Sequence, residues 1–150
     1  EFVWYKFRTM YQDSDDSIHK NLIKDMASGK KSDGKKISND QRITSIGKIL
    51  RKYSFDEFPQ LINVINGDMT LVGPRPVADY ELALLDEWQK TRFNVTPGIT
   101  GLWQVLGRND VGFNEQFVLD KYYIENQSLI FDLEILLKTI PVVILGRGGA

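Results

Sequence analysis

Cysteine is absent from the 150 residues of this chain, and histidine is nearly absent. Without cysteine the chain can form no disulfide, no thiolate zinc site and no thiol nucleophile, which is compatible with a reducing compartment. His19 is the only histidine, and it lies in a polar stretch. A Ser-His-Asp arrangement or a multi-histidine metal site would depend on this one residue, so the sequence argues against both.

A large net charge and a long apolar run are also missing. The 19 basic and 20 acidic side chains give a formal net charge of −1, so the overall electrostatic field does not point to a nucleic acid polymer as partner. The most apolar stretch, residues 129–145, is interrupted by charged residues and a proline. It falls short of the roughly 20 apolar residues that span a bilayer. We expect it to pack in the core or to lie in a membrane interface.

The length and the apolar periodicity predict one domain, residues 1–150, with an α+β fold that is mainly helical. Because the chain opens on strand-like sequence without an initiator methionine, we interpret it as a piece of a longer protein. The predicted strands of a small sheet span residues 2–10, 70–72 and 101–105. The predicted helices span residues 18–26, 42–52, 61–65, 79–93, 113–125 and 129–145. The expected core residues of the helices 79–93 and 113–125 are Leu82, Leu85, Trp88, Phe93, Phe117, Leu119, Tyr123 and Ile124.

Two adjacent acids, Asp56 and Glu57, stand directly before a short apolar helical run. Ser54 and Glu57 have the spacing of a capping box, and Tyr53 is placed to pack on Phe58 as a hydrophobic staple. Both acids are therefore expected in the first helical turn, where free N–H groups and the helix dipole favour negative charge or phosphate. The ordinary interpretation is that they only cap the helix. The alternative is a site that brings a carboxylate, a metal ion and a phosphate together.

Cations at several places in the chain favour the second interpretation. Arg75 stands between Pro74 and Pro76, which restrict the backbone on both sides and would present the guanidinium rigidly to a phosphate. The same tripeptide can also be only a stiff turn, and cations on a strand can be only a solvated face. The candidate anion-binding cations are Lys6, Arg8, Arg42, Arg51, Arg75 and Arg108.

A lysine-rich segment, residues 29–40, has no apolar periodicity and is expected to be a mobile loop. Such a charge run is usually solvated. It can also lie on an anionic membrane surface, where each cation contributes roughly 1 kcal/mol.

Five motifs in this order resemble the bacterial sugar transferase family, the monotopic polyprenyl-phosphate phosphoglycosyl transferases. They span residues 6–10, 42–44, 54–60, 67–76 and 97–105, and the resemblance extends from Tyr5 to about Gly148. Three departures are visible. Phe55 and Phe58 stand where the family commonly has leucine, Leu106 replaces a common small residue, and the membrane-entering hairpin of the family would precede the first residue.

The resemblance implies an activity: transfer of a sugar 1-phosphate from a UDP-sugar to polyprenyl (undecaprenyl) phosphate, with loss of UMP. It implies that Asp56 is the nucleophile and carries the phosphosugar, that Glu57 binds Mg²⁺, and that Asp68 is a metal ligand or supports one. Gln104 joins the candidate cations as a substrate-binding residue. The reaction would begin capsule, O-antigen or exopolysaccharide assembly at the cytoplasmic face of the inner membrane, with the lipid surface as a partner and a possible homo-oligomer.

The residues agree with this chemistry. An aspartate with an ordinary pKa of about 3.9 is ionised at neutral pH and needs no general base. Its obstacle is repulsion from the diphosphate that it attacks, which nearby cations and a divalent metal would reduce. Two other functions stay open: an aspartyl-phosphate hydrolase, in which water completes the reaction, and a non-catalytic membrane-peripheral interaction domain. No motif identifies the sugar.

Overall fold

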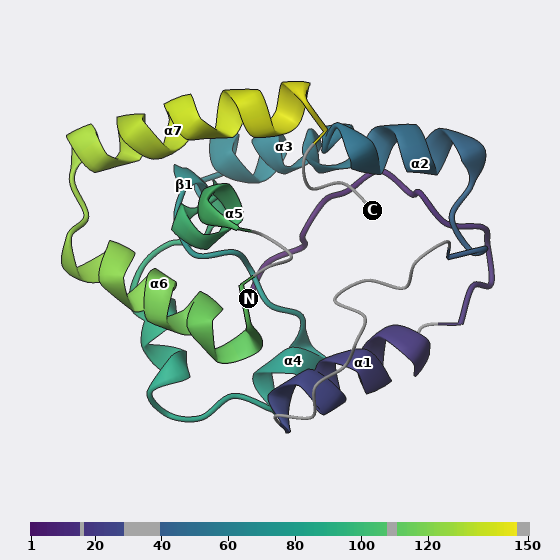
Figure 1. Ribbon diagram of the computed structural model, residues 1–150, viewed down its shortest axis with the longest axis horizontal. Helices are drawn as coiled ribbons and strands as arrows, with labels where there is room; N and C mark the ends of the chain where they lie inside the picture. The colour runs from purple at the N-terminus through teal and green to yellow at the C-terminus, as the bar shows by residue number, and fades with distance from the viewer. Residues whose placement is uncertain (16, 29–39, 108–110, 147–150) are drawn as a thin grey trace.

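The computed structural model describes residues 1–15, 17–28, 40–107 and 111–146. Of the predicted mobile segment 29–40, all but Asp40 lie outside the described residues, as does Arg108. Figure 1 shows the described elements, which are α1 (Ser17–Ala27), α2 (Ser45–Lys52), the 3-10 turn η1 (Phe55–Glu57), α3 (Gln60–Ile65), β1 (Thr70–Val72), α4 (Asp79–Leu82), the 3-10 turn η2 (Gln89–Asn94), β2 (Gly98–Thr100), α5 (Leu102–Leu106), α6 (Phe113–Glu125) and α7 (Leu129–Ile144).

The fold is mainly helical with a small sheet, which confirms the predicted α+β class. β1 and β2 form a parallel pair in which Thr70 pairs with Gly98 and Val72 with Thr100. The predicted strand at 101–105 is wrong, because the strand ends at Thr100 and residues from Leu102 onward form α5. A short apolar run bounded by glycine is compatible with a strand or a helix. Here the residues that pair with β1 lie just before this run.

The predicted strand 2–10 is also wrong as a sheet strand. Among the described residues its ladder contact is one isolated antiparallel bridge, between Met10 and Ile43. The backbone N–H and C=O groups of this segment still need hydrogen-bond partners. A side chain and a turn provide them. Tyr5 N–H donates to Asn63 Oδ1 at 3.2 Å, and Asn63 Nδ2 donates to the carbonyl of Val3 at 2.7 Å.

The predicted helix 79–93 consists of two short elements, α4 and η2. Of its four expected core residues Leu85 alone is buried, and the other three are 42% exposed or more. The inward positions of η2 are taken by two polar residues, Gln89 and Arg92, which are 3% and 6% exposed. Arg92 pairs there with the buried Asp120 of α6, so a buried ion pair replaces the apolar stripe that helical spacing predicted.

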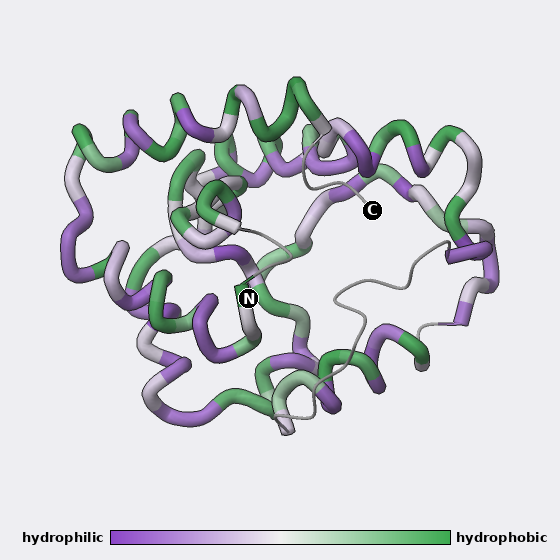
Figure 2. Tube along the Cα trace, viewed as in Figure 1, coloured by the Kyte–Doolittle hydropathy of each residue, from purple (hydrophilic) through white to green (hydrophobic). Residues whose placement is uncertain are grey.

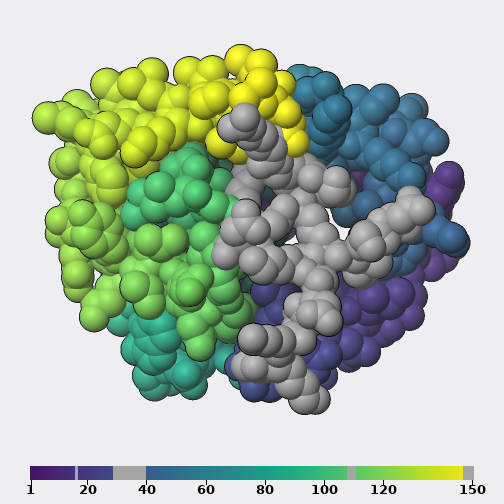
Figure 3. All heavy atoms as spheres, viewed as in Figure 1, coloured from purple at the N-terminus to yellow at the C-terminus, as the bar shows by residue number. Residues whose placement is uncertain are grey.

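The core lies between the sheet, α5, α6 and α7. Its buried members are Val72, Leu102, Tyr123 and Ile135. The Tyr123 hydroxyl donates to Val72 O at 3.2 Å or to Asp132 Oδ1 at 2.7 Å, which connects three elements. The space-filling view shows the α6 and α7 segments closely packed over this region (Figure 3). In α6 the predicted core residues Phe117 and Tyr123 are buried, and Leu119 and Ile124 are partly buried.

α7 continues through Pro141, the proline that interrupts the apolar run, and ends at Ile144, one residue before the predicted end. The proline lies in the last turn, where one lost hydrogen bond leaves the rest of the helix intact. In the described part of the chain, helices long and apolar enough to cross a membrane are absent.

A glycine is required at position 98, where the two paired strands approach each other closely. A Cβ at this position would lie 2.0 Å from Gly73 N and 2.5 Å from Val72 C, both backbone atoms. We expect Gly98→Ala to lower the free energy of unfolding by about 2 kcal/mol or more, because the strands must separate. Urea unfolding measures the loss. Gly112→Ala is the control, since its Cβ would meet only the flexible Glu115 side chain, and an equal loss there would contradict the explanation.

Candidate active site

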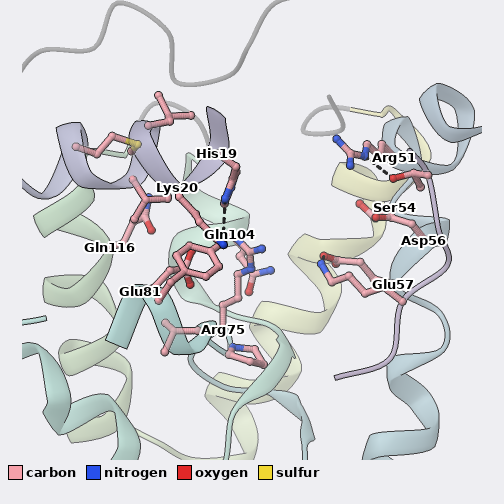
Figure 4. Close-up of a pocket in the computed structure, with 18 of the residues that line it drawn as sticks. His19, Lys20, Arg51, Ser54, Asp56, Glu57, Arg75, Glu81, Gln104 and Gln116 are labelled. Carbon is pink, nitrogen blue, oxygen red and sulfur yellow. Dashed lines mark hydrogen bonds and ion pairs between the residues drawn. The ribbon is translucent and has the colours of Figure 1, made fainter. Parts of the chain in front are cut away.

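A cavity of about 710 Å³ opens between η1 with the N-terminal segment on one side and α1, α4 and α5 on the other. Figure 4 shows its labelled residues in two groups: Arg51, Ser54, Asp56 and Glu57 face Arg75 and Gln104 across the opening. The predicted site residues that line the cavity are Lys6, Arg8, Arg42, Arg51, Asp56, Glu57, Arg75 and Gln104. Asp68 is not among the lining residues. It lies at the end of α3, with Oδ2 3.4 Å from Asn63 Nδ2.

The two acids are held in η1, which precedes α3 rather than forming its first turn. Ser54 has a left-handed backbone (φ 56°) and its side chain does not cap η1, so the predicted capping box is wrong. The aromatic contacts also differ from the predicted staple. Phe55 stacks against both Tyr53 and Phe58, with ring centres 5.9 and 5.0 Å apart. Asp56 and Glu57 line the cavity, and Phe55 is not among the lining residues.

Lys6 is held against the acids by the backbone. Phe7 N–H donates to the carbonyl of Asp56 at 2.9 Å, and Lys6 Nζ lies 3.0 Å from Glu57 Oε1. Burial raises the pKa of Asp56 above its ordinary value, and the Glu57 charge raises it further, while Lys6 opposes both. Asp56 is thus a partly desolvated carboxylate with a cation beside it, which favours nucleophilic chemistry over simple capping.

Arg51 and Arg42 frame the same side of the cavity. Arg51 Nε donates to Thr9 Oγ1 at 2.8 Å, so the end of α2 is tied to the N-terminal segment. Arg42 forms an ion pair with Asp40, with Nη2 and Oδ2 2.7 Å apart. Arg42 therefore has an acidic partner within the chain, whereas Arg51 is hydrogen-bonded to a neutral hydroxyl and its charge acts on Asp56 and Asp40.

Trp4 contacts one cation from each side of the cavity. Lys6 Nζ lies 4.3 Å from the centre of its ring, and the guanidinium carbon of Arg75 lies 5.4 Å from the same ring. Both are cation–π distances. Arg75 Nε is buried and has no hydrogen-bond partner among the described residues. A buried donor of this kind is stabilised when a ligand oxygen accepts from it.

Comparison with known proteins identifies the family. The model of the family described as "Bacterial sugar transferase" matches residues 1–146. The chain belongs to the bacterial sugar transferase family. The matched residues include all those that line the cavity and all five motifs on which the resemblance was based.

Individual relatives are similar to this chain along nearly its whole length. The exopolysaccharide production protein ExoY of Rhizobium meliloti is 45% identical over 99% of this chain and 66% of its own length. The undecaprenyl-phosphate galactose phosphotransferase of Salmonella typhimurium is 44% identical over 99% of this chain and 31% of its own. The UDP-galactose-lipid carrier transferase of Erwinia amylovora is 46% identical over 100% of this chain and 31% of its own. The chain thus spans two thirds or less of these relatives.

The acids of the cavity fit a magnesium ion only if a substrate supplies further ligands. Among the described residues, clusters of three or more acidic or histidine side chains that could hold a metal are absent. Glu57 and the neighbouring Asp56 are the carboxylates that line the cavity near Lys6. Mg²⁺ commonly binds one or two carboxylates together with substrate phosphates, so the donor set fits such an ion. The metal role of Asp68 stays a prediction.

Several residues that line the cavity or contact its lining escaped the sequence analysis. Trp4 and Thr9 lay in a segment interpreted as a strand, and Arg92 lay in a predicted amphipathic helix. His19, which the sequence places in a polar stretch, lies beside Tyr80, with Nδ1 2.9 Å from the hydroxyl. Their roles depend on contacts between residues far apart in the chain, for which the sequence carries no local pattern.

Proposed function

We propose that this chain is the catalytic domain of a phosphoglycosyl transferase that moves a sugar 1-phosphate from a UDP-sugar to polyprenyl phosphate. The observation that carries the proposal is the pair Asp56 and Glu57, which faces Arg75 across the cavity with Lys6 against the acids. The names of the Salmonella and Erwinia relatives support a lipid acceptor, and the Erwinia name supports a UDP-sugar donor.

In the first step, a carboxylate oxygen of Asp56 attacks the phosphorus that carries the sugar. The bond from this phosphorus to the bridging oxygen breaks, and UMP leaves with the electron pair. Negative charge grows on the departing phosphate, where Lys6 and Arg75 would stabilise it by hydrogen bonds and charge. The product is a phosphosugar esterified to Asp56.

In the second step, a phosphate oxygen of the polyprenyl phosphate attacks the same phosphorus. The aspartyl ester breaks, the Asp56 carboxylate is restored, and the lipid carries a diphosphate-linked sugar. Mg²⁺ held by Glu57 and substrate phosphates would reduce the repulsion between anions. Glu57 itself would hold Lys6 in place through the 3.0 Å ion pair whenever the metal is not bound.

We propose that this domain works at a membrane surface, where a lipid acceptor would lie, and that the surface is the cytoplasmic face of the inner membrane. Exposed apolar side chains on α2, α3 and α7 support this part of the proposal. These helices lie along one edge of the molecule, where hydrophobic residues recur (Figure 2). The strongly exposed members are Ile46, Ile49, Ile65, Leu129, Ile130 and Ile144, each 59% exposed or more.

A direct test incubates the full-length protein with a panel of UDP-sugars and measures UMP. We expect one or a few sugars to release UMP. We expect EDTA to abolish the release until Mg²⁺ is restored, because the described residues supply too few ligands to keep the metal without its substrate. Full activity in EDTA would remove Mg²⁺ from the mechanism. Steady UMP release without polyprenyl phosphate would favour the hydrolase alternative, and no release from any sugar would favour a non-catalytic domain.

A further inference from the structure

Arg92 is a buried cation that the chemistry above does not use. It lies in η2, 6% exposed, away from the acids of η1. Its Nη2 lies 3.0 Å from Asp120 Oδ2 and donates to the backbone carbonyl of Arg75 at 2.6 Å. Its guanidinium carbon lies 4.9 Å from the ring centre of Phe117. One side chain thus contacts α6 and the segment between the two prolines.

A buried ion pair needs a reason. Removing both charges from water costs several kcal/mol per ion, and apolar residues of similar volume would often stabilise the fold as well or better. Asp120 is 1% exposed, and burial raises its pKa to about 6 even with Arg92 beside it. The pair Lys90–Glu87, on and next to the same η2, is by contrast exposed. Packing alone does not account for the buried pair.

The backbone carbonyl of Arg75 is the group that the Arg92–Asp120 pair keeps in place. Gly73 N–H donates to Thr100 O at 2.9 Å, and Gly98 N–H donates to Pro74 O at 2.9 Å, so the sheet fixes the chain as far as Pro74. Beyond it the next backbone acceptor is Arg75 O, which accepts from Arg92. This bond fixes the peptide that follows Arg75, and with it the direction in which the Arg75 side chain leaves the backbone.

We propose that Arg92, anchored by Asp120, is a positioning residue that orients Arg75 toward the diphosphate of the donor. The inference rests on the proposed function. Arg75 needs such support because its Nε has no partner among the described residues. An orientation set by the protein lowers the entropy lost when the guanidinium binds phosphate. Arg92 lines the same cavity as Arg75, and its hydrogen bond goes to the Arg75 carbonyl while its ion pair is with Asp120.

A double-mutant cycle tests the inference in the full-length enzyme, with UMP release as the signal. We expect Arg92→Gln to lower kcat at least about tenfold in the wild type, but less than about twofold when Arg75 is already lysine. The reason is that a residue acting through Arg75 has little left to lose once the guanidinium is gone. A purely structural role would give the same factor in both backgrounds.

Lys90→Gln is the matched control, because it removes a cation from the same element without touching Arg75, and we expect unchanged kcat. Thermal unfolding identifies variants that do not fold. If Arg92→Gln is one of them, Arg92→Lys replaces it in the cycle, since lysine keeps the charge but loses the planar fork. Equal factors in both backgrounds overturn the inference. A wild-type enzyme that releases no UMP would instead overturn the proposed function.

Discussion

Asp56→Asn in the full-length protein is expected to abolish UMP release and lipid product together, a loss of at least about 10³-fold in kcat. Asparagine keeps the size of the side chain but has no carboxylate to attack phosphorus. The fold should survive, because the contact of this residue with the N-terminal segment is made by its backbone carbonyl, which accepts from Phe7 N–H at 2.9 Å. Radiolabelled UDP-sugar with separation of UMP measures both products.

Glu57→Gln is the control for this variant. It removes the neighbouring charge and with it the ion pair with Lys6, but leaves the nucleophile in place. We expect a slower reaction that needs more Mg²⁺ and retains measurable activity. Wild-type turnover by Asp56→Asn would show that another group attacks the phosphorus.

Arg75→Lys is expected to lower turnover more than tenfold while the protein stays folded. The Nε of Arg75 is buried, and its guanidinium carbon lies 5.4 Å from the centre of the Trp4 ring. A planar guanidinium therefore lies at the cavity wall. A lysine keeps the charge, yet its ammonium is a point donor that cannot give two parallel hydrogen bonds to one phosphate. Initial rates at saturating UDP-sugar measure the loss.

Lys121→Gln serves as the control for Arg75→Lys, because Lys121 belongs to an exposed pair with Glu125 and lies outside the cavity lining. Its rate should equal that of the wild type. Unchanged turnover of a folded Arg75→Lys protein would mean that the two prolines and the arginine form only a stiff turn.

Local apolar patterns predicted correctly those elements in which the regularly spaced apolar residues are also the buried ones. α6 matches its predicted bounds, residues 113–125, and α3 ends at Ile65, the last residue of the predicted helix 61–65. The adjacent carboxylates and the arginine between prolines were visible for the same reason, since each is defined by near neighbours. The structure brings both to one cavity.

The errors arise where distant residues decide the structure. Asn63, in α3, satisfies the backbone of residues 3 and 5, so an extended segment forms no sheet strand. Asp120 draws Arg92 inward and disrupts the predicted helix 79–93. In both cases a buried polar side chain overrides a local apolar pattern, because an unpaired buried group costs more than the propensity difference. Sequence spacing carries no information about such partners.

The central claim is that Asp56 carries the phosphosugar between the two steps. Its most direct test is intact-protein mass spectrometry of the full-length enzyme after incubation with UDP-sugar and Mg²⁺ but no lipid acceptor. We predict the added mass of one phosphosugar, located by digestion on the peptide that contains Asp56 and discharged when polyprenyl phosphate is supplied. Product that forms only with both substrates present, with no adduct under any trapping condition, would mean a direct displacement and would contradict the claim.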